Sequence, residues 1–495
     1  MICISIAQES RRFALADMVN AAKQCDLIEV RLDRFAKAPD VGELVANKPK
    51  PVIFSCRRRQ DGGEWEGSEE ERLAILRQCI ISKADYVEIE LDVADQIRKF
   101  PPAKRVISYT NFQETPADIA DIYAEMQSKS PDVIKLVTLA RTPEEAWPLV
   151  QLLAKPALPT VVVGLGKPGV MLTVLGKKIG APFTYAALER GMESYPGQPT
   201  IADLEKVYHY QQIGRSTRLI GVTGLGAQEV ATVAVLNGAL AHLGLGARCL
   251  PLQVGSLRVF RKVIDAVKLA AVVVDEEHRG SILEIATELA PEAAQAQAAD
   301  VMLHPQEKWL GHNTLGTAAA EALEAALRGD LATQRPLVDR PVMIVGTNAA
   351  ARSLAFAVKE RGAAVIIAAR DRDTAHELAK AVDGRHIQFE GLYSTMHEVL
   401  AVCSEEKLPA STKGKAEKVS IHVGHLKPGL TVMDLTSMPR KSPLLCEAEA
   451  RHCRVVSPRR VLREQLFHQI RLISNKEVPR ERLDEIMNEV MEEEE

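Results

Sequence analysis

A lysine interrupts an apolar run in the first third of the chain. Lys135 lies in Asp132-Val-Ile-Lys-Leu-Val-Thr-Leu-Ala140, whose short length and β-branched residues are typical of a buried strand of a parallel sheet. An unpaired ammonium is costly to bury, and the neutral amine that burial favours is the nucleophile that forms Schiff bases. The alternative is a structural lysine at a strand end, whose head reaches water or pairs with a carboxylate.

Charged residues follow a two-residue period in a segment nearer the N-terminus. Leu27-Ile-Glu-Val-Arg-Leu-Asp33 places Glu29, Arg31 and Asp33 on one face of an extended strand. If the strand belongs to a barrel, its outer face packs on helices, so the charged face is expected to be the interior one. There, carboxylates and arginines can pair with each other or with a substrate.

Two polar turns supply further groups. Phe54-Ser-Cys-Arg57 runs into Arg58-Arg-Gln-Asp-Gly-Gly63, whose glycines can bring the backbone close to a ligand. Arg57 is a candidate anion clamp, whereas Arg58 and Arg59 are expected in a solvated loop. The turn Ser194-Tyr-Pro-Gly-Gln198 would place a hydroxyl and an amide beside them.

Repeated strand and helix patterns must position these groups. We predict strands at 2-7, 27-33, 51-57, 86-91, 105-110, 133-139, 160-165 and 183-188, with amphipathic helices between them. One such helix begins near Ser68 with three glutamates, as helix N-termini prefer. Eight alternating units in one domain-sized block fit a (β/α)₈ barrel better than an open sheet, and place the site at the C-terminal strand ends.

Length and composition bound the class of protein. The 495 residues predict about three domains, and a net charge of -4 with 26% charged residues argues against nucleic acid or an acidic membrane surface as a partner. The eight cysteines form no CxxC pair, so the sequence suggests neither a metal set nor disulfides. No leader and no apolar run of roughly 20 residues is present, which indicates a soluble, cytoplasmic protein acting on small molecules. A homo-oligomer is compatible with these features.

The second half predicts an α/β nucleotide-binding region. Pro341-Val-Met-Ile-Val-Gly-Thr-Asn-Ala-Ala-Ala351 reads as a strand, a tight turn and a helix start, and a second strand follows at the spacing of a βαβ unit. Arg370 and Arg372 follow that second strand and favour the 2′-phosphate of NADP over NAD, although ordinary surface arginines are the alternative. The cofactor-binding candidates are Gly346, Asn348, Ala349, Ala350, Arg370 and Arg372.

The first half resembles type I 3-dehydroquinate dehydratases. The matching motifs occur in the family order: Ile28-Glu-Val-Arg-Leu-Asp33, Ser55-Cys-Arg57 with Asp61-Gly-Gly63, Arg105-Val-Ile-Ser-Tyr-Thr-Asn-Phe112, Asp132-Val-Ile-Lys135 and Ser194-Tyr-Pro-Gly-Gln-Pro-Thr200. The resemblance implies that Lys135 forms an imine with the substrate ketone, which acidifies the neighbouring C–H so that water can leave. It also implies no cofactor for this half, and substrate contacts from Ser5, Glu29, Arg31, Arg57, Ser194 and Gln198.

Departures from the family pattern affect proton transfer and anion binding. Thr110 stands where the family has a histidine, and loss of such acid/base help is worth about 10²–10⁴-fold in rate unless another group substitutes. Asp61 is the nearest substitute by sequence. Leu165 and Leu172-Thr173 stand where the family has a methionine and a Ser-Arg pair, so substrate binding should weaken by about 1.5–3 kcal/mol.

The second half resembles shikimate dehydrogenase, and the fusion resembles bifunctional dehydratase-dehydrogenase proteins. The resemblance implies substrate contacts from Asn237, Asn313 and Gln465. The family's Ser-x-Ser clamp, catalytic lysine and catalytic aspartate map onto Val230-Ala-Thr232, Arg279 and Leu315. Arginine is a poor proton donor and leucine offers none, whereas His278 could serve.

The expected fold is therefore α/β, with an N-terminal (β/α)₈ barrel followed by a two-subdomain dehydrogenase with a Rossmann-like domain. The expected domains are 1-215 for the barrel, 216-335 for a substrate subdomain with returning helix 459-475, 336-458 for the nucleotide subdomain and 476-495 for an acidic helical tail. A mobile loop is expected at 403-420. Two hypotheses follow: an enzyme with both activities, or a degenerate homologue whose dehydrogenase half is a binding or scaffold module and whose dehydratase activity is weak or lost.

Overall fold

The computed structural model describes residues 1–328, 335–404 and 421–491. It divides into two compact units, of which the first comprises 1–238 and 246–269 and the second 239–245 and 270–495. Most of the loop expected at 403-420 lies outside the described residues, as do the last four residues of the acidic tail.

The first unit contains an eight-stranded parallel sheet in which each strand from β1 to β6 pairs with the next along the chain and β8 pairs with β1, so that β7 and β8 are the two ends of the strand order. The predicted (β/α)₈ fold is confirmed, and all eight strands lie where the sequence placed them within a few residues. The strands are β1(Ile2–Ile6), β2(Leu27–Arg31), β3(Val52–Ser55), β4(Tyr86–Glu90), β5(Lys104–Asn111), β6(Val133–Leu139), β7(Thr160–Leu165) and β8(Thr184–Ala186).

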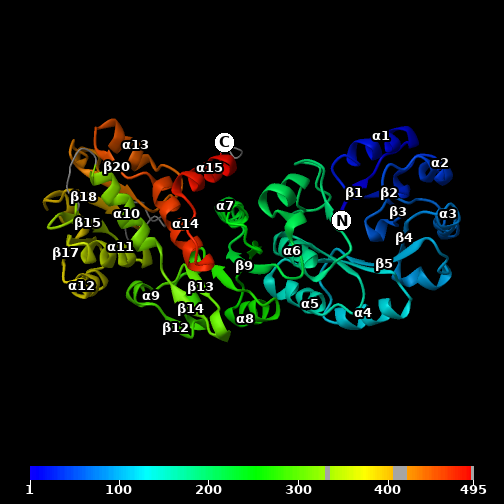
Figure 1. Ribbon diagram of the computed structural model, residues 1–495, viewed down its shortest axis with the longest axis horizontal. Coiled ribbons are helices and arrows are strands. Elements are labelled where there is room, and N and C mark those ends of the chain that lie inside the picture. Colours follow the sequence, from blue (N-terminus) through cyan, green and yellow to red (C-terminus); the bar gives the residue numbers. More distant parts are fainter. Residues whose placement is uncertain (329–334, 405–420, 492–495) are drawn as a thin grey trace, which may run out of the picture. The chain divides into compact units, whose positions relative to one another are not determined.

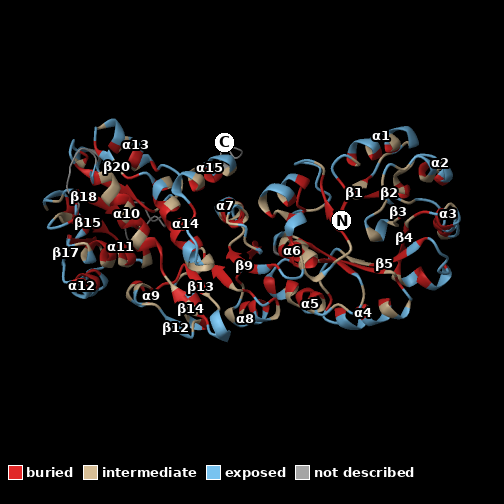
Figure 2. Ribbon diagram, in the orientation of Figure 1, coloured by how far each residue is buried: buried red, intermediate tan, exposed pale blue. Residues whose placement is uncertain are grey.

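Helices cover the outside of these strands (Figure 1), and their outward faces are exposed while the strands are buried (Figure 2). The predicted helix near Ser68 is confirmed: the Ser68 side chain accepts from the Glu71 backbone, and the Glu71 carboxylate accepts from the Ser68 backbone. The helices are α1(Arg11–Ala21), α2(Val41–Ala46), α3(Glu69–Ile81), α4(Ile119–Ser128), α5(Pro143–Ala154) and α6(Val170–Ile179), and the 3₁₀ helix η3(Leu91–Gln96) joins β4 to β5.

The two-residue period of the strands builds the barrel interior in layers. An apolar layer is followed, two residues nearer each C-terminal strand end, by a polar or charged residue on the same face. The pairs are Cys3 and Ser5, Leu27 and Glu29, Ile53 and Ser55, Tyr86 and Glu88, and Val133 and Lys135. The apolar layer closes the barrel below the charged one, so the charged residues are screened from water.

The first unit continues beyond the boundary expected at residue 215. It includes the parallel strands β9(Arg218–Thr223) and β10(Ala247–Leu252), most of α7(Ala227–His242), and α8(Leu257–Ala266). Side chains link this segment to the barrel: the Glu144 carboxylate on α5 accepts from the Ser256 backbone at the start of α8, at 2.8 Å.

The second unit contains two sheet regions. Strands β11(Ala271–Val273), β13(Val301–Leu303), β14(Leu310–His312) and β12(Glu288–Leu289) lie side by side in that order. The second region is a parallel sheet in the order β17-β16-β15-β18-β19-β20, formed by β15(Pro341–Val345), β16(Ala364–Ala369), β17(Arg385–Gln388), β18(Val399–Val402), β19(Thr431–Asp434) and β20(Arg454–Val455). Because this order reverses direction at β15, as in dinucleotide-binding folds, the predicted Rossmann-like subdomain is confirmed.

The helices of the second unit are α9(Pro291–Ala296), α10(Leu315–Arg328), α11(Ala349–Glu360), α12(Arg372–Ala381), α13(Pro443–Ala450), α14(Pro458–Ser474) and α15(Arg480–Met491). The returning helix predicted at 459-475 is α14, which packs on α10. Among the described helices of the whole chain, none is both long and apolar enough to cross a membrane.

Candidate active site

Lys135 is buried in the charged layer of the barrel. Its Nζ lies 2.8 Å from Glu88 Oε2 and donates to the hydroxyl of Tyr185 at 2.9 Å. All three residues are less than a tenth exposed. The ammonium therefore does not reach water, and the carboxylate and phenol that hold it come from strands on either side of the barrel.

Arg57 lies between two carboxylates of the same layer. Its Nη2 pairs with Glu29 and lies 3.3 Å from Glu88 Oε2, while Ser55 Oγ donates to Glu29 at 2.8 Å. With Lys135, these groups form two cations against two carboxylates, which lets the layer be buried at no net charge. Arg57 Nε is buried and has no acceptor among the described residues, so one donor remains for an incoming anion.

The surroundings fix two protonation states in this layer. Burial raises the pKa of Glu29, but Arg57 and Lys135 outweigh it and the pKa is lowered overall. Burial and the nearby Glu29 carboxylate raise the pKa of Tyr185 well above 10. Glu29 is therefore held as a carboxylate and Tyr185 as a neutral phenol.

Arg31 holds a loop over the strand ends. It makes two hydrogen bonds to Asp33, at 2.9 and 2.7 Å, and a third to the carbonyl of Gly62 at 3.0 Å. Gly62 has φ +76°, and a Cβ there would lie 2.5 Å from the Phe112 ring, so the turn is built around glycine. The predicted substrate contact at Arg31 is thus an arginine already paired to its own strand end.

The Asp61 carboxylate is paired with Arg58. It accepts from Arg58 Nε at 2.6 Å, and Arg58 makes two more bonds to Asp92. Among the described residues no hydrogen bond or ion pair joins Asp61 to Lys135. The sequence placed Arg58 and Arg59 in a solvated loop. This was wrong for Arg58, whose side chain is held by the two carboxylates and is only 19% exposed. The Arg59 side chain is 74% exposed, as expected.

The remaining predicted contacts of this half meet at one cavity. Ser5, Ser194 and Gln198 line a space of about 270 Å³ at the C-terminal ends of β1 and β8. The Gln198 side-chain oxygen accepts from the Ser194 backbone at 2.6 Å, which fixes the turn and leaves the amide NH₂ as a donor. Thr110 is half-buried on β5, opposite Val137 of β6.

The side chain of Asn237 hydrogen-bonds to backbone groups of the first unit. Its amide donates to the carbonyls of Val207 and Cys249, and its oxygen accepts from the Cys249 backbone at 2.7 Å. With both amide groups in use, this residue has a structural role in the described conformation.

In the second unit, Asp300 binds one of the residues that sequence reasoning singled out, Gln465, and lies near a second, Asn313. Gln465 of α14 donates to Asp300 Oδ2 at 2.8 Å, and Thr314 donates to the same carboxylate from its backbone and hydroxyl. The neighbouring Asn313 donates to the carbonyl of Ala298. All are less than a tenth exposed, so this polar cluster is buried.

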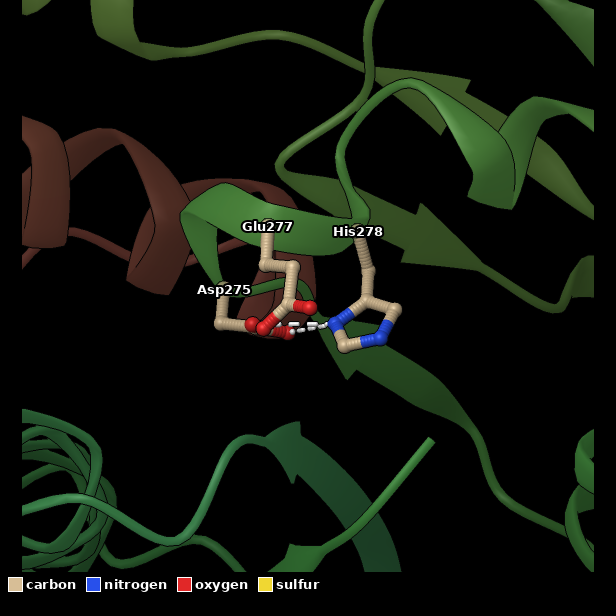
Figure 3. A group of neighbouring side chains, drawn as sticks. All are labelled: Asp275, Glu277 and His278. Carbon is tan, nitrogen blue, oxygen red and sulfur yellow. Dashed lines mark hydrogen bonds and ion pairs between the residues drawn. The ribbon is translucent and has the colours of Figure 1, made fainter. Parts of the chain in front are cut away.

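A histidine lies beside this cluster, on the loop after β11. His278 Nδ1 lies 2.9 Å from Asp275 Oδ1, and the second ring nitrogen points away from both Asp275 and Glu277 (Figure 3). The ligand atoms of the three residues lie within 4.8 Å of one another. Backbone bonds from Val274 to Asp300 and from Ala299 to Arg279 fix the loop against the strand that follows Asp300.

The family's two other catalytic positions carry no proton donor here. Arg279 Nε is buried without an acceptor among the described residues. Leu315 is 4% exposed and packs in the apolar core with Leu323 and Leu354. Of the three residues considered from the sequence, His278 is thus the one whose geometry suits proton transfer.

The turn after β15 fits a dinucleotide phosphate in most respects. Gly346 has φ +109°, and a Cβ there would lie 2.0 Å from Ser404 Oγ. The first-turn N–H groups of Ala349 and Ala350 have no acceptor within α11. Asn348 departs from the pattern, because its side chain accepts from the Ala351 backbone and donates to the carbonyl of Cys403.

The two arginines that are candidates for binding a 2′-phosphate differ in their contacts and exposure. Arg370 pairs with Glu390 at 3.2 Å and lies over the Phe389 ring. Arg372 begins α12 and is exposed. Arg372 is therefore the more accessible cation at the end of β16.

Three buried groups were not among the residues singled out from the sequence: Glu88, Tyr185 and Asp300. Glu88 could have been found by the reasoning applied to Glu29, since Tyr86-Val-Glu-Ile-Glu90 repeats charge at a two-residue period within an apolar strand. Asp300 precedes the apolar run of β13 directly. Tyr185 carried no comparable signal, because aromatic residues are usual in barrel strands.

Comparison with known proteins identifies relatives of the first half of the chain. The sequence model of type I 3-dehydroquinase matches residues 2–215. The chain is 33% identical over 207 residues to the 3-dehydroquinate dehydratase of Methanopyrus kandleri, covering 39% of this chain and 93% of that protein. Through residues 2–215, the chain belongs to the type I 3-dehydroquinase family.

The similarity extends into the second half. The chain is 29% identical over 482 residues to the chloroplastic bifunctional 3-dehydroquinate dehydratase/shikimate dehydrogenase of Arabidopsis thaliana, covering 94% of this chain and 80% of that protein. Among solved structures, shikimate dehydrogenase from Aquifex aeolicus matches with TM-score 0.48 and 18% identity over 55% of this chain and 98% of that one. Dehydroquinate dehydratase and shikimate dehydrogenase from S. pombe AroM match with TM-score 0.44 and 16% identity over 99% and 98%.

Proposed function

We propose that the chain is a bifunctional enzyme of the shikimate pathway, which leads to aromatic amino acids. The first half dehydrates 3-dehydroquinate to 3-dehydroshikimate, and the second reduces 3-dehydroshikimate to shikimate with NADPH. The observation that carries the proposal is Lys135, buried in a neutral cluster of charges inside a barrel of the dehydratase family. The site suits an imine-forming amine, because Lys135 is buried with a carboxylate 2.8 Å from its nitrogen that can take up a proton as the amine attacks a ketone.

The dehydratase step needs a ketone over Lys135 and an anchored carboxylate. The unpaired Nε of Arg57 supplies a donor for that carboxylate, and Ser5, Ser194 and Gln198 offer hydroxyl and amide groups in the cavity at the C-terminal ends of β1 and β8. Absorbance of the conjugated product follows this step with 3-dehydroquinate as substrate. Activity in the wild type that is lost in Lys135→Met supports the assignment, and equal activity in both contradicts it.

The reductase step needs a proton at the forming hydroxyl. When bound, NADPH supplies the hydride, and the Gly346 turn with Arg372 would hold its phosphates. His278 supplies the proton from Nε2, with Asp275 fixing the ring through Nδ1. His278→Gln should abolish NADPH oxidation with 3-dehydroshikimate while NADPH still binds in a fluorescence titration. If the wild type binds NADPH without oxidising it, the second half is a binding module.

The location and assembly of the protein complete the proposal. We infer action in the cytoplasm on small-molecule substrates, without nucleic acid or membrane partners, from the charge balance and the scattered cysteines. The Arabidopsis relative is chloroplastic by name, so imaging of the tagged protein is the direct test. Light scattering of the full chain distinguishes a monomer from a homo-oligomer.

A further inference from the structure

We propose that Glu88 is the acid/base group that moves protons to and from Lys135 during imine formation and hydrolysis. This inference rests on the proposed function, since it concerns the same lysine. It starts from the 2.8 Å contact between Lys135 Nζ and Glu88 Oε2, which joins residues 47 positions apart in the sequence.

Imine formation sets the proton balance that this group must serve. The ammonium nitrogen begins with three protons and ends as a protonated imine with one, while the ketone oxygen leaves as water. Two protons must therefore pass from nitrogen to oxygen as the C–N bond forms and the C–O bond breaks. Glu88 accepts each proton from nitrogen and gives it to oxygen, so that it ends as the carboxylate it began as.

The other groups that face Lys135 are poorly suited to this work. Glu29 lies 4.0 Å from Nζ and is held ionised by Arg57, so it is a weak base. Tyr185 keeps its proton because burial raises its pKa well above 10. Cys3 of β1 is buried, and burial raises the pKa of its thiol too.

Two further residues are excluded by their contacts or chemistry. Asp61 is bound to Arg58, and Thr110 does not titrate near neutrality. Glu88 is thus the one carboxylate within hydrogen-bond distance of Lys135 Nζ among the described residues.

A matched pair of variants isolates this role. Glu88→Gln keeps the shape of the side chain but cannot relay a proton. Glu90→Gln makes the same change two residues along β4, where the carboxylate contacts Arg72 at 2.8 Å instead of Lys135. Circular dichroism checks that each variant is folded, and Glu88→Asp retains a carboxylate that should restore part of the rate.

The measurement is the rate at which cyanoborohydride traps 3-dehydroquinate on the full chain, taken from about pH 6 to 9. In the wild type and in Glu90→Gln the rate should be nearly independent of pH, because Glu88 receives the proton. In Glu88→Gln it should be about 10²–10⁴-fold lower at neutral pH and rise with pH as hydroxide or free amine replaces the relay. A purely structural defect would lower the rate equally at every pH.

The outcomes separate this inference from the proposed function. No trapped adduct in the wild type would overturn the proposed function. A trapped adduct with an unchanged rate and profile in Glu88→Gln would overturn the role of Glu88 alone. If Glu88→Gln does not fold, the wild-type profile decides: a rate rising about tenfold per pH unit shows that no internal base takes the proton.

Discussion

Arg57 and Glu29 form a buried ion pair inside the barrel, with Glu88 3.3 Å from the same guanidinium nitrogen. The pair joins the ends of two neighbouring strands, and its arginine keeps one donor unpaired. The same residue therefore balances the charged layer and offers a contact to a substrate carboxylate.

Arg57→Gln should destabilise the fold and weaken substrate binding together. Removing this charge leaves Glu29 and Glu88 with Lys135 as their remaining cation in the layer, which costs about 3–5 kcal/mol for a broken buried pair. Urea unfolding and the KM for 3-dehydroquinate measure the two effects. Arg59→Gln is the control, because its pair with Glu66 is exposed and should contribute less than about 1 kcal/mol. Equal effects from both variants would contradict the role given to Arg57.

Gly346→Ala should abolish NADPH binding. The methyl group would lie 2.0 Å from Ser404 Oγ at a φ of +109°, so the turn must move. Gly429→Ala is a matched control, since Gly429 has φ +92° with no atom within 4 Å of the added carbon. Titration of each variant with NADPH, followed by nucleotide fluorescence, checks the expectation. Tight binding by Gly346→Ala would show that the nucleotide lies elsewhere.

Arg372→Ala should weaken NADPH binding by about tenfold or more and leave NADH binding nearly unchanged. The reason is the loss of a charge-assisted hydrogen bond to the 2′-phosphate, typically worth about 1.5–3 kcal/mol. Dissociation constants for both nucleotides, in the variant and the wild type, give the selectivity directly. A parallel loss for the two nucleotides would indicate a structural role for this arginine instead.

Acid should destabilise the nucleotide subdomain through a histidine pair. His397 Nε2 lies 3.1 Å from His425 Nε2, and burial lowers the pKa of both imidazoles, aided at His425 by His397 and Lys427. Because the unfolded chain then binds protons more readily, the stabilising effect is present above a pH of about 6.5 and is lost as the pH falls.

His425→Gln removes part of this dependence. The difference in melting temperature between the variant and the wild type, measured at pH 7.5 and at pH 5.5, should change in favour of the variant at the lower pH. A difference that stays constant would show that the pair does not titrate in this range.

The sequence predicted the strands of the barrel well, because buried strands carry a two-residue period and short apolar runs that are local properties. It identified Lys135 and Glu29 because each places a charge within such a strand, and Arg57 because it stands where a strand runs into a polar turn. It did not predict which charges pair. Lys135 meets Glu88 across the barrel interior, and Asp61 turns to Arg58, and both outcomes depend on the packing of distant strands.

In the second half, the sequence indicated the nucleotide turn and Gln465 but not Asp300, the carboxylate that Gln465 binds. Leu315 shows what could be learned from its place in the family pattern alone. A leucine at a family aspartate position packs into the apolar core, so the proton donor must come from another residue. His278 was found because it lies next to the substituted lysine position in the sequence.

The central claim is that Lys135 forms an imine with a ketone substrate. Borohydride reduction in the presence of 3-dehydroquinate, followed by peptide mass spectrometry, tests it most directly. The expected result is a reduced adduct on the peptide containing Lys135 in the wild type and no adduct in Lys135→Ala. An unmodified wild-type peptide, or the same adduct in both proteins, would contradict the claim.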